Sequence, residues 1–128
     1  MIASRVQELT ALLEALLSAP AIRVGDLLTS SPAAADVPGV YLISQSPEIS
    51  TQVYIGRTKT KSVLGRLRDH CRMKTGSDLA GMLSRHTTFP QETSGYYLRW
   101  VSILDGVERA QLELFAIAVL RPPFNRYI

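Results

Sequence analysis

Residues 39–56, GVYLISQSPEISTQVYIG, decide the fold of this chain. They contain two short runs of β-branched and aromatic residues, 40–43 and 53–55, and each run is typical of a strand. The residues between the runs include a proline, serines and a charged side chain, a composition that favours a loop. The stretch therefore predicts a β-hairpin with one tyrosine in each strand, Tyr41 and Tyr54.

The residues before the hairpin divide into a helix and a connection. Residues 4–17 repeat apolar side chains at helical spacing, which predicts an amphipathic helix. Residues 19–38 are rich in Ala, Ser, Pro and Asp, which is typical of a connection, with a short turn near residues 24–28. We expect an N-terminal helix and linker over residues 1–36 and one domain over residues 37–128. The apolar side of the helix suits either core packing or docking, to a protein partner or to a second copy of the chain.

Two helices, a strand and a last helix are expected after the hairpin. A serine cap predicts a helix over residues 63–74, and residues 77–85 predict a second, shorter one. Residues 96–101 alternate between two faces as a third strand. Asp105, with a glutamate three residues later, predicts the start of a final helix that ends near Leu120, because two prolines follow. This order predicts an α+β domain in which helices pack against an antiparallel sheet.

Length and composition narrow the class of protein. A chain of 128 residues forms one domain by default and can bury a core without disulfides. Its single cysteine, Cys71, excludes an internal disulfide, which suits a reducing cytoplasm. The apolar stretch at residues 10–19 is interrupted by Glu14, which argues against a signal peptide, and no apolar run is long enough to span a membrane. We expect a cytoplasmic protein with no membrane contact.

The formal net charge of +3 conceals a strong local bias. Residues 57–74, here called the basic segment, contain seven basic side chains and one acid, Asp69, whereas the rest of the chain has more acidic than basic residues. The basic residues are Arg57, Lys59, Lys61, Arg66, Arg68, Arg72 and Lys74. Such a segment suits a polyanion such as nucleic acid, and it equally suits a solvated helix face.

Glu113 is the only ionisable residue between positions 110 and 120, in an otherwise apolar helix. A carboxylate in such a helix costs free energy unless it is paired or bound to a cation. The alternative is a narrow polar stripe facing water, shared with Arg109 one turn away. In the preceding basic helix, Arg66 and His70 are four residues apart and so share a face, which is not the apolar face.

Taken in order, these residues resemble the GIY-YIG nuclease family. The tripeptide GVY at residues 39–41 has valine in place of the family's isoleucine, and YIG at residues 54–56 is intact. Arg66 matches the arginine of the helix that follows in the family. His70 matches a position, one turn later, where many members have histidine or tyrosine.

Two further matches lie near the C-terminus. Glu113 matches the family's metal-binding glutamate, and residues 123–125, PFN, match its proline–aromatic–asparagine element. The resemblance covers about residues 37–126 and leaves the N-terminal helix outside it. It implies a small three-stranded antiparallel sheet flanked by helices, and hydrolysis of DNA phosphodiesters with one divalent cation, Mg²⁺ or Mn²⁺, held by Glu113.

The resemblance also implies roles for the other matched residues. Arg66 would neutralise charge on the phosphate in the transition state. A tyrosine would activate the attacking water, with Tyr41 as the first choice and Tyr54 as the second, and nearby cations would lower its pKa. His70 would hydrogen-bond a tyrosine or the water, and Asn125 would brace the site from behind.

These observations favour a metal-dependent DNA endonuclease. Two alternatives stay open: a nucleic-acid-binding module that does not cut, and a catalytic subunit of a larger DNA-processing assembly. A pure binder would need the basic segment but not Glu113, and this favours the enzyme. The residues expected to contact DNA are Arg57, Lys59, Lys61, Arg68 and Arg72.

Overall fold

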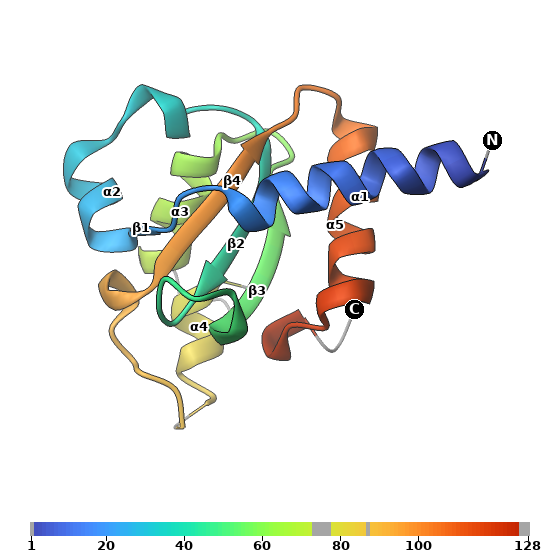
Figure 1. Cartoon of the computed structure of the whole chain (residues 1–128). Coiled ribbons are helices and arrows are strands. Elements are labelled where there is room, and N and C mark those ends of the chain that lie inside the picture. The colour runs from blue at the N-terminus through green and yellow to red at the C-terminus, as the bar shows by residue number, and fades with distance from the viewer. Residues whose placement is uncertain (1, 73–77, 87, 126–128) are drawn as a thin grey trace.

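An antiparallel sheet lies at the centre of the molecule (Figure 1). The computed structural model describes residues 2–72, 78–86 and 88–125, and within them the sheet has four strands in the order β1-β4-β2-β3. The strands are β1 (Ile22–Arg23), β2 (Gly39–Ser44), β3 (Gln52–Arg57) and β4 (Tyr97–Ser102). The expected hairpin is therefore present as β2 and β3, and the expected third strand is β4.

The prediction of three strands was wrong by one. Strand β1 lies in the stretch that was expected to be a connection, and it pairs with β4 through Ile22 opposite Leu98 and Arg23 opposite Tyr97. A two-residue strand has too few side chains to show alternation, so this pairing leaves no periodic signal in the sequence.

Five α-helices surround the sheet in the described part of the chain. They are α1 (Ile2–Ser18), α2 (Val24–Ser30), α3 (Val63–Arg72), α4 (Leu79–Leu83) and α5 (Gly106–Leu120). Asp105 caps α5 by accepting a hydrogen bond from the backbone N–H of Val107. Helix α2 corrects the expectation of a short turn near residues 24–28. The expected helix ends at Lys74 and Ser77 lie outside the described residues.

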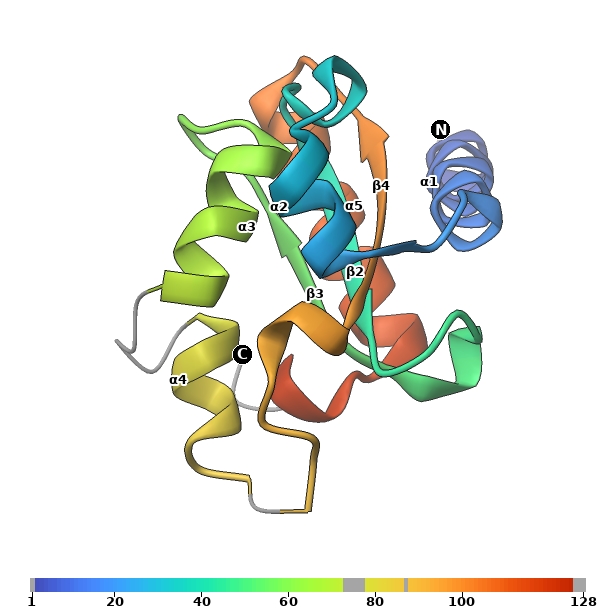
Figure 2. The same ribbon diagram turned by 90° about the vertical axis from the view of Figure 1, so that its left-hand side faces the viewer.

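Helices cover both faces of the sheet, so every residue of β2 is buried. Figure 2 shows α3 and α4 on one side of the sheet and α1 on the other. Helices α2, α3 and α4 pack on the face that carries Tyr41 and Ile43. Helices α1 and α5 pack on the face that carries Val40 and Leu42.

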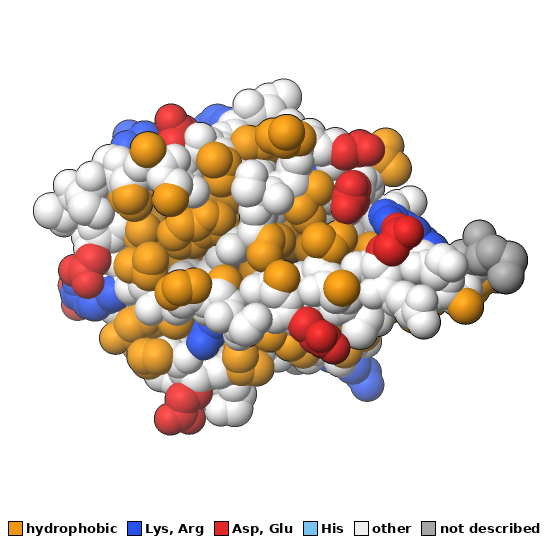
Figure 3. Space-filling view, turned by 45° about the horizontal axis from the view of Figure 1, so that its top comes forward, with side chains coloured by type: hydrophobic (Ala, Val, Ile, Leu, Met, Phe, Trp, Pro, Cys, Tyr) orange, Lys and Arg blue, Asp and Glu red, His pale blue; other side chains and the backbone are white. Residues whose placement is uncertain are grey.

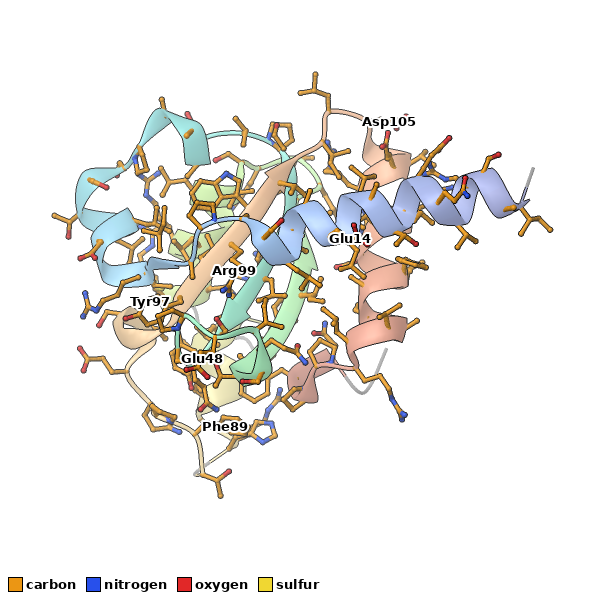
Figure 4. All side chains as sticks on the ribbon, viewed as in Figure 1. Glu14, Glu48, Phe89, Tyr97, Arg99 and Asp105 are labelled. Atoms are coloured by element: carbon orange, nitrogen blue, oxygen red, sulfur yellow. The ribbon has the colours of Figure 1, made fainter. Side chains whose placement is uncertain are left out.

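The apolar side of α1 packs into the core of the same chain. Leu13 and Leu16 are buried against β2 and α5, whereas Val6 is 46% exposed. Arg99 of β4, at the C-terminal end of α1 in Figure 4, donates from Nε to the carbonyl of Ala19 at 3.2 Å and so ties that end to the sheet. Of the alternatives left open for this helix, core packing therefore accounts for its apolar side.

The molecular face in Figure 3 has hydrophobic side chains across its middle and charged side chains mainly around its edge.

None of the described helices is both long enough and apolar enough to cross a bilayer.

The glycines of the hairpin allow close packing. A Cβ atom on Gly39 would lie 2.1 Å from the carbonyl oxygen of Val101 in β4. A Cβ on Gly56 would lie 2.4 Å from the hydroxyl oxygen of Tyr41. Any larger residue would therefore separate the strands or displace the tyrosine. Since Tyr41 lies opposite Gly56 and Ile43 opposite Tyr54, the two tyrosines are on the same face of the sheet.

Candidate functional site

A polar cavity of about 560 Å³ opens beside the hairpin. It brings together side chains from β2, β3, α3, α5 and the loop between β3 and α3, which are far apart in the sequence. The lining residues are Tyr41, Tyr54, Arg57, Lys59, Thr60, Lys61, Arg66, Asp69 and Glu113. Four of the six residues expected to be catalytic line this cavity, while His70 and Asn125 do not.

Tyr41 lines the cavity but is itself almost completely buried. It is 2% exposed, and its hydroxyl is 2.7 Å from Nε2 of His70. Burial raises the pKa of Tyr41, Tyr54 raises it further, and the Arg66 guanidinium opposes the rise. Burial is also the main cause that raises the pKa of Tyr54. Arg66 therefore acts on the pKa of Tyr41 in the expected direction, but burial outweighs it, and the pKa of the phenol is raised overall.

The contacts and burial of His70 determine its charge and which ring nitrogen carries the proton. The backbone N–H of Leu79, at the start of α4, donates to Nδ1 of His70 at 2.7 Å, so that nitrogen carries no proton. Burial, reinforced by Arg66, lowers the pKa of His70 to about 3, and the ring is neutral near pH 7. A neutral ring whose Nδ1 accepts must carry its proton on Nε2, so His70 donates to the Tyr41 hydroxyl oxygen.

The expectation that His70 lies away from the apolar face was wrong. His70 is completely buried, beside Tyr41 and below the first residue of α4. Its ring also lies edge-on to both tyrosines, with centroids 5.5 Å from Tyr41 and 5.4 Å from Tyr54. The spacing of Arg66 and His70 gave no sign of this burial, because the burial of His70 depends on where α4 packs.

Asp69 joins two of the basic side chains in the cavity. Its Oδ2 atom is 2.6 Å from Nζ of Lys61 and 3.2 Å from a terminal nitrogen of Arg66. The carboxyl group is only 7% exposed, and Lys61, followed by Arg66, holds its pKa below the usual range despite the burial. Sequence reasoning missed this role, although Asp69 is the only acid in the basic segment.

Glu113 is the second carboxylate of the cavity. Its Oε1 atom accepts a hydrogen bond from Nε of Arg57 at 3.0 Å, and its side chain is 18% exposed. Burial raises the pKa of Glu113, and Arg57 opposes that rise. The alternative of a water-facing stripe shared with Arg109 is wrong, because Arg109 is buried and donates to backbone carbonyls.

The residues expected to contact DNA separate into two groups. Arg57, Lys59 and Lys61 line the cavity, although Arg57 is paired with Glu113 and Lys61 with Asp69. Arg68 donates to the hydroxyl of Ser31 at 3.1 Å, and neither it nor Arg72 lines the cavity. Lys74 lies outside the described residues.

Asn125 acts on the edge strand rather than in the cavity. Its Oδ1 accepts from the backbone N–H of Ile55 at 2.8 Å, and its Nδ2 donates to the carbonyl of Ile55 at 2.9 Å. The side chain therefore satisfies both backbone groups of the residue between Tyr54 and Gly56. It positions the segment of β3 that carries one of the two tyrosines.

The donor atoms of the cavity suit a hard cation that keeps much of its water. Glu113 offers a carboxylate and the tyrosines offer phenol oxygens, whereas Asp69 already accepts from two cations. Within the described residues no group of three His, Cys, Asp or Glu side chains is placed to hold a metal. A single carboxylate with several waters is a common arrangement for Mg²⁺, so these residues fit that ion.

No family model matches this chain, and no curated protein matches it. Among solved structures, the chain is similar to the magnesium-bound GIY-YIG N-terminal endonuclease domain of UvrC from Thermotoga maritima, with 22% identity and a TM-score of 0.48, over 90% of this chain and 96% of that one. A point mutant of that domain, bound to its catalytic divalent cation, also gives 22% identity and a TM-score of 0.48, over 90% and 94%.

Proposed function

We propose that this chain is an endonuclease that hydrolyses DNA phosphodiester bonds with the help of one divalent cation, Mg²⁺ or Mn²⁺. The observation that carries the proposal is the convergence of Tyr41, Tyr54, Arg66 and Glu113 on one cavity from four separate elements. These are residues whose order in the sequence resembles that of the GIY-YIG nucleases, and folding brings them within reach of one bound group.

The charges of the cavity favour a phosphate. Four cationic side chains and two carboxylates line it, so positive charge is in excess there. The cations are Arg57, Lys59, Lys61 and Arg66. A phosphodiester entering the cavity would accept hydrogen bonds from these donors, and an arginine can bind two phosphate oxygens at once.

Glu113 would hold the divalent cation, since it is the cavity's one carboxylate that is not shared between two cations. When bound, the ion supplies a Lewis acid that polarises the scissile phosphate and stabilises the leaving oxygen. Arg57 donates a hydrogen bond to the same carboxylate, so it would have to release Glu113 or share it with the cation. Arg66 would neutralise the charge that develops on the phosphate, and Asp69 holds its guanidinium in place.

Tyr41 is the proposed general base, with Tyr54 as the alternative. The Nε2–H of His70 donates to the Tyr41 hydroxyl, and the positive charge of the Arg66 guanidinium lowers the pKa of that phenol, so both groups stabilise a phenolate. His70 cannot accept the phenolic proton at Nε2, because that nitrogen already carries one. The buried phenol keeps its proton until further positive charge enters the cavity, since positive charge close to a phenol lowers its pKa.

A cleavage assay tests this function against the alternative of a binding module that does not cut. Supercoiled, branched and single-stranded DNA would be incubated with the protein, with and without Mg²⁺ or Mn²⁺. We expect nicking that requires the cation, loss of nicking in Glu113→Gln, and DNA binding that survives in that variant. Glu14→Gln is the matched control, because Glu14 is an exposed residue of α1 (Figure 4) and does not line the cavity. Binding without cleavage of any substrate would favour the alternative.

A further inference from the structure

Arg109 is a buried cation whose hydrogen-bond partners are backbone carbonyls. It lies in the first turn of α5 and is 8% exposed. Its Nε donates to Thr58 at 2.9 Å, and its terminal nitrogens donate to Ile103 and Leu104 at 2.9 Å and to Lys59 at 3.3 Å. Across the described residues, no carboxylate forms an ion pair with it. Its desolvation is therefore offset by main-chain oxygens alone.

The position of Arg109 is unfavourable for the helix that carries it. A cation near a helix N-terminus opposes the helix dipole, and the first turn of α5 gives no local reason for an arginine. The residue instead joins two loops: the one before α5 and the one after β3, which is about 50 residues away in the sequence. Gly106 leaves room for this arrangement, because a Cβ there would lie 3.3 Å from a terminal nitrogen of Arg109.

The loop after β3, residues 58–61, is here called the lysine loop. It supplies Lys59, Thr60 and Lys61 to the cavity. Its first residue, Thr58, is buried and exchanges hydrogen bonds with Gly39 of β2. At its other end, the Lys61 side chain is held by Asp69. Between these two ends, the main chain of Lys59 is held by Arg109.

We propose that Arg109 is a positioning residue that fixes the main chain of the lysine loop, so that Lys59 is held at the cavity to bind a DNA phosphate. This inference rests on the proposed function for its ligand. Arg109 precedes Glu113 by four residues on α5, so the same helix sets the position of the lysine loop and of the proposed metal ligand. The distance between the bound phosphate and the carboxylate then depends on the two hydrogen bonds that Arg109 donates to the lysine loop, at Thr58 and Lys59.

A double-mutant cycle on DNA binding tests the coupling. Binding of a short duplex would be measured across a salt series without divalent cation, for the parent, Arg109→Lys, Lys59→Ala and the double variant. Lysine at position 109 keeps the charge but has one nitrogen, which cannot span four carbonyls. The salt slope is the slope of the logarithm of the binding constant against the logarithm of the salt concentration. We expect Lys59→Ala to reduce the magnitude of this slope by about 1 in the parent and by less than half of that in Arg109→Lys.

Arg72→Ala is the control for this cycle, because Arg72 belongs to α3 and is neither part of the lysine loop nor among the hydrogen-bond partners of Arg109. It should change the salt slope by the same amount in both backgrounds. A global loss of stability in Arg109→Lys would alter both cycles alike. An equal effect of Lys59→Ala in the two backgrounds would overturn the proposal.

Amide hydrogen exchange tests the same inference without DNA. The N–H of Thr58 donates to the carbonyl of Gly39 at 2.9 Å, so its exchange rate reports on the start of the lysine loop. We expect Arg109→Lys to accelerate exchange at Thr58 at least tenfold while Leu42, in the centre of the sheet, keeps its parent rate. If Arg109→Lys does not fold, Gly106→Ala displaces the guanidinium more gently and should give the same pattern. Unchanged exchange at Thr58 would refute the positioning role, and a parent that does not bind DNA would refute the proposed function instead.

Discussion

Replacing Arg57 with glutamine should strengthen metal binding at Glu113. The Nε atom of Arg57 lies 3.0 Å from Oε1 of Glu113, so a divalent cation held by Glu113, as proposed, would have to compete with this guanidinium for the carboxylate. Two unit charges at that distance attract by about 1.4 kcal/mol in bulk water and by roughly four times as much at an effective dielectric constant of 20. The side chains are 28% and 18% exposed, and exposed pairs contribute up to about 1 kcal/mol.

The low end of this range of attraction energies is the relevant one, because Arg57 stays in contact with water when the cation displaces it from Glu113. About 1 to 1.4 kcal/mol corresponds to a roughly five- to tenfold lower Kd for the metal. Isothermal titration with Mg²⁺, or the spin-resonance signal of Mn²⁺, measures this Kd in the absence of DNA. The titration should be done near pH 8, since removal of Arg57 takes away a charge that lowers the pKa of Glu113.

Arg68→Gln is the control for this titration. Arg68 belongs to the same basic segment but bonds Ser31 and does not line the cavity, so its removal should leave the Kd for the metal unchanged. Glu113→Gln should abolish the binding. If Arg57→Gln binds the metal no more tightly than Arg68→Gln, the competition between Arg57 and the cation does not exist, and the reasoning fails.

Three further changes have definite expected outcomes. Arg66→Lys keeps the charge but loses the planar fork, and we expect at least a tenfold loss of cleavage rate with little change in Tm; full activity would make Arg66 a generic cation. Asp69→Asn should cost about 1–3 kcal/mol in unfolding free energy near neutral pH. The folded-state pKa of Asp69 is lowered from its ordinary value of 3.8, so the stability difference between the parent and Asp69→Asn should persist above pH 4 and shrink as the pH falls through the folded pKa. Urea unfolding at several pH values measures this difference. A stability difference that stays constant with pH would contradict the prediction. Asn125→Ala leaves both backbone groups of Ile55 unpaired at the sheet edge and should cost about 2–4 kcal/mol, measured by thermal melting, whereas a change below 0.5 kcal/mol would show that water replaces the amide.

The sequence alone predicted the features that depend on neighbours along the chain. The hairpin follows from two β-branched runs around a proline-containing loop, and the last helix follows from the Asp105 cap and the prolines after it. The apolar side of α1 follows from its helical spacing. Such signals are local, because dihedral preferences, caps and side-chain periodicity act over a few residues. The four matched residues that line the cavity were picked out by their order along the chain, and their catalytic roles stay predictions.

The tertiary structure decided everything that depends on which distant groups meet. Strand β1 exists because β4 pairs with it, and His70 is neutral with its proton on Nε2 because α4 packs over it and supplies the N–H of Leu79. The raised pKa of Tyr41 is likewise a result of burial rather than of sequence. Burial, ion pairing and desolvation depend on packing between residues tens of positions apart, and no local pattern encodes those distances. For the same reason only the folded chain shows that Arg109, four residues before Glu113, holds the lysine loop by its backbone.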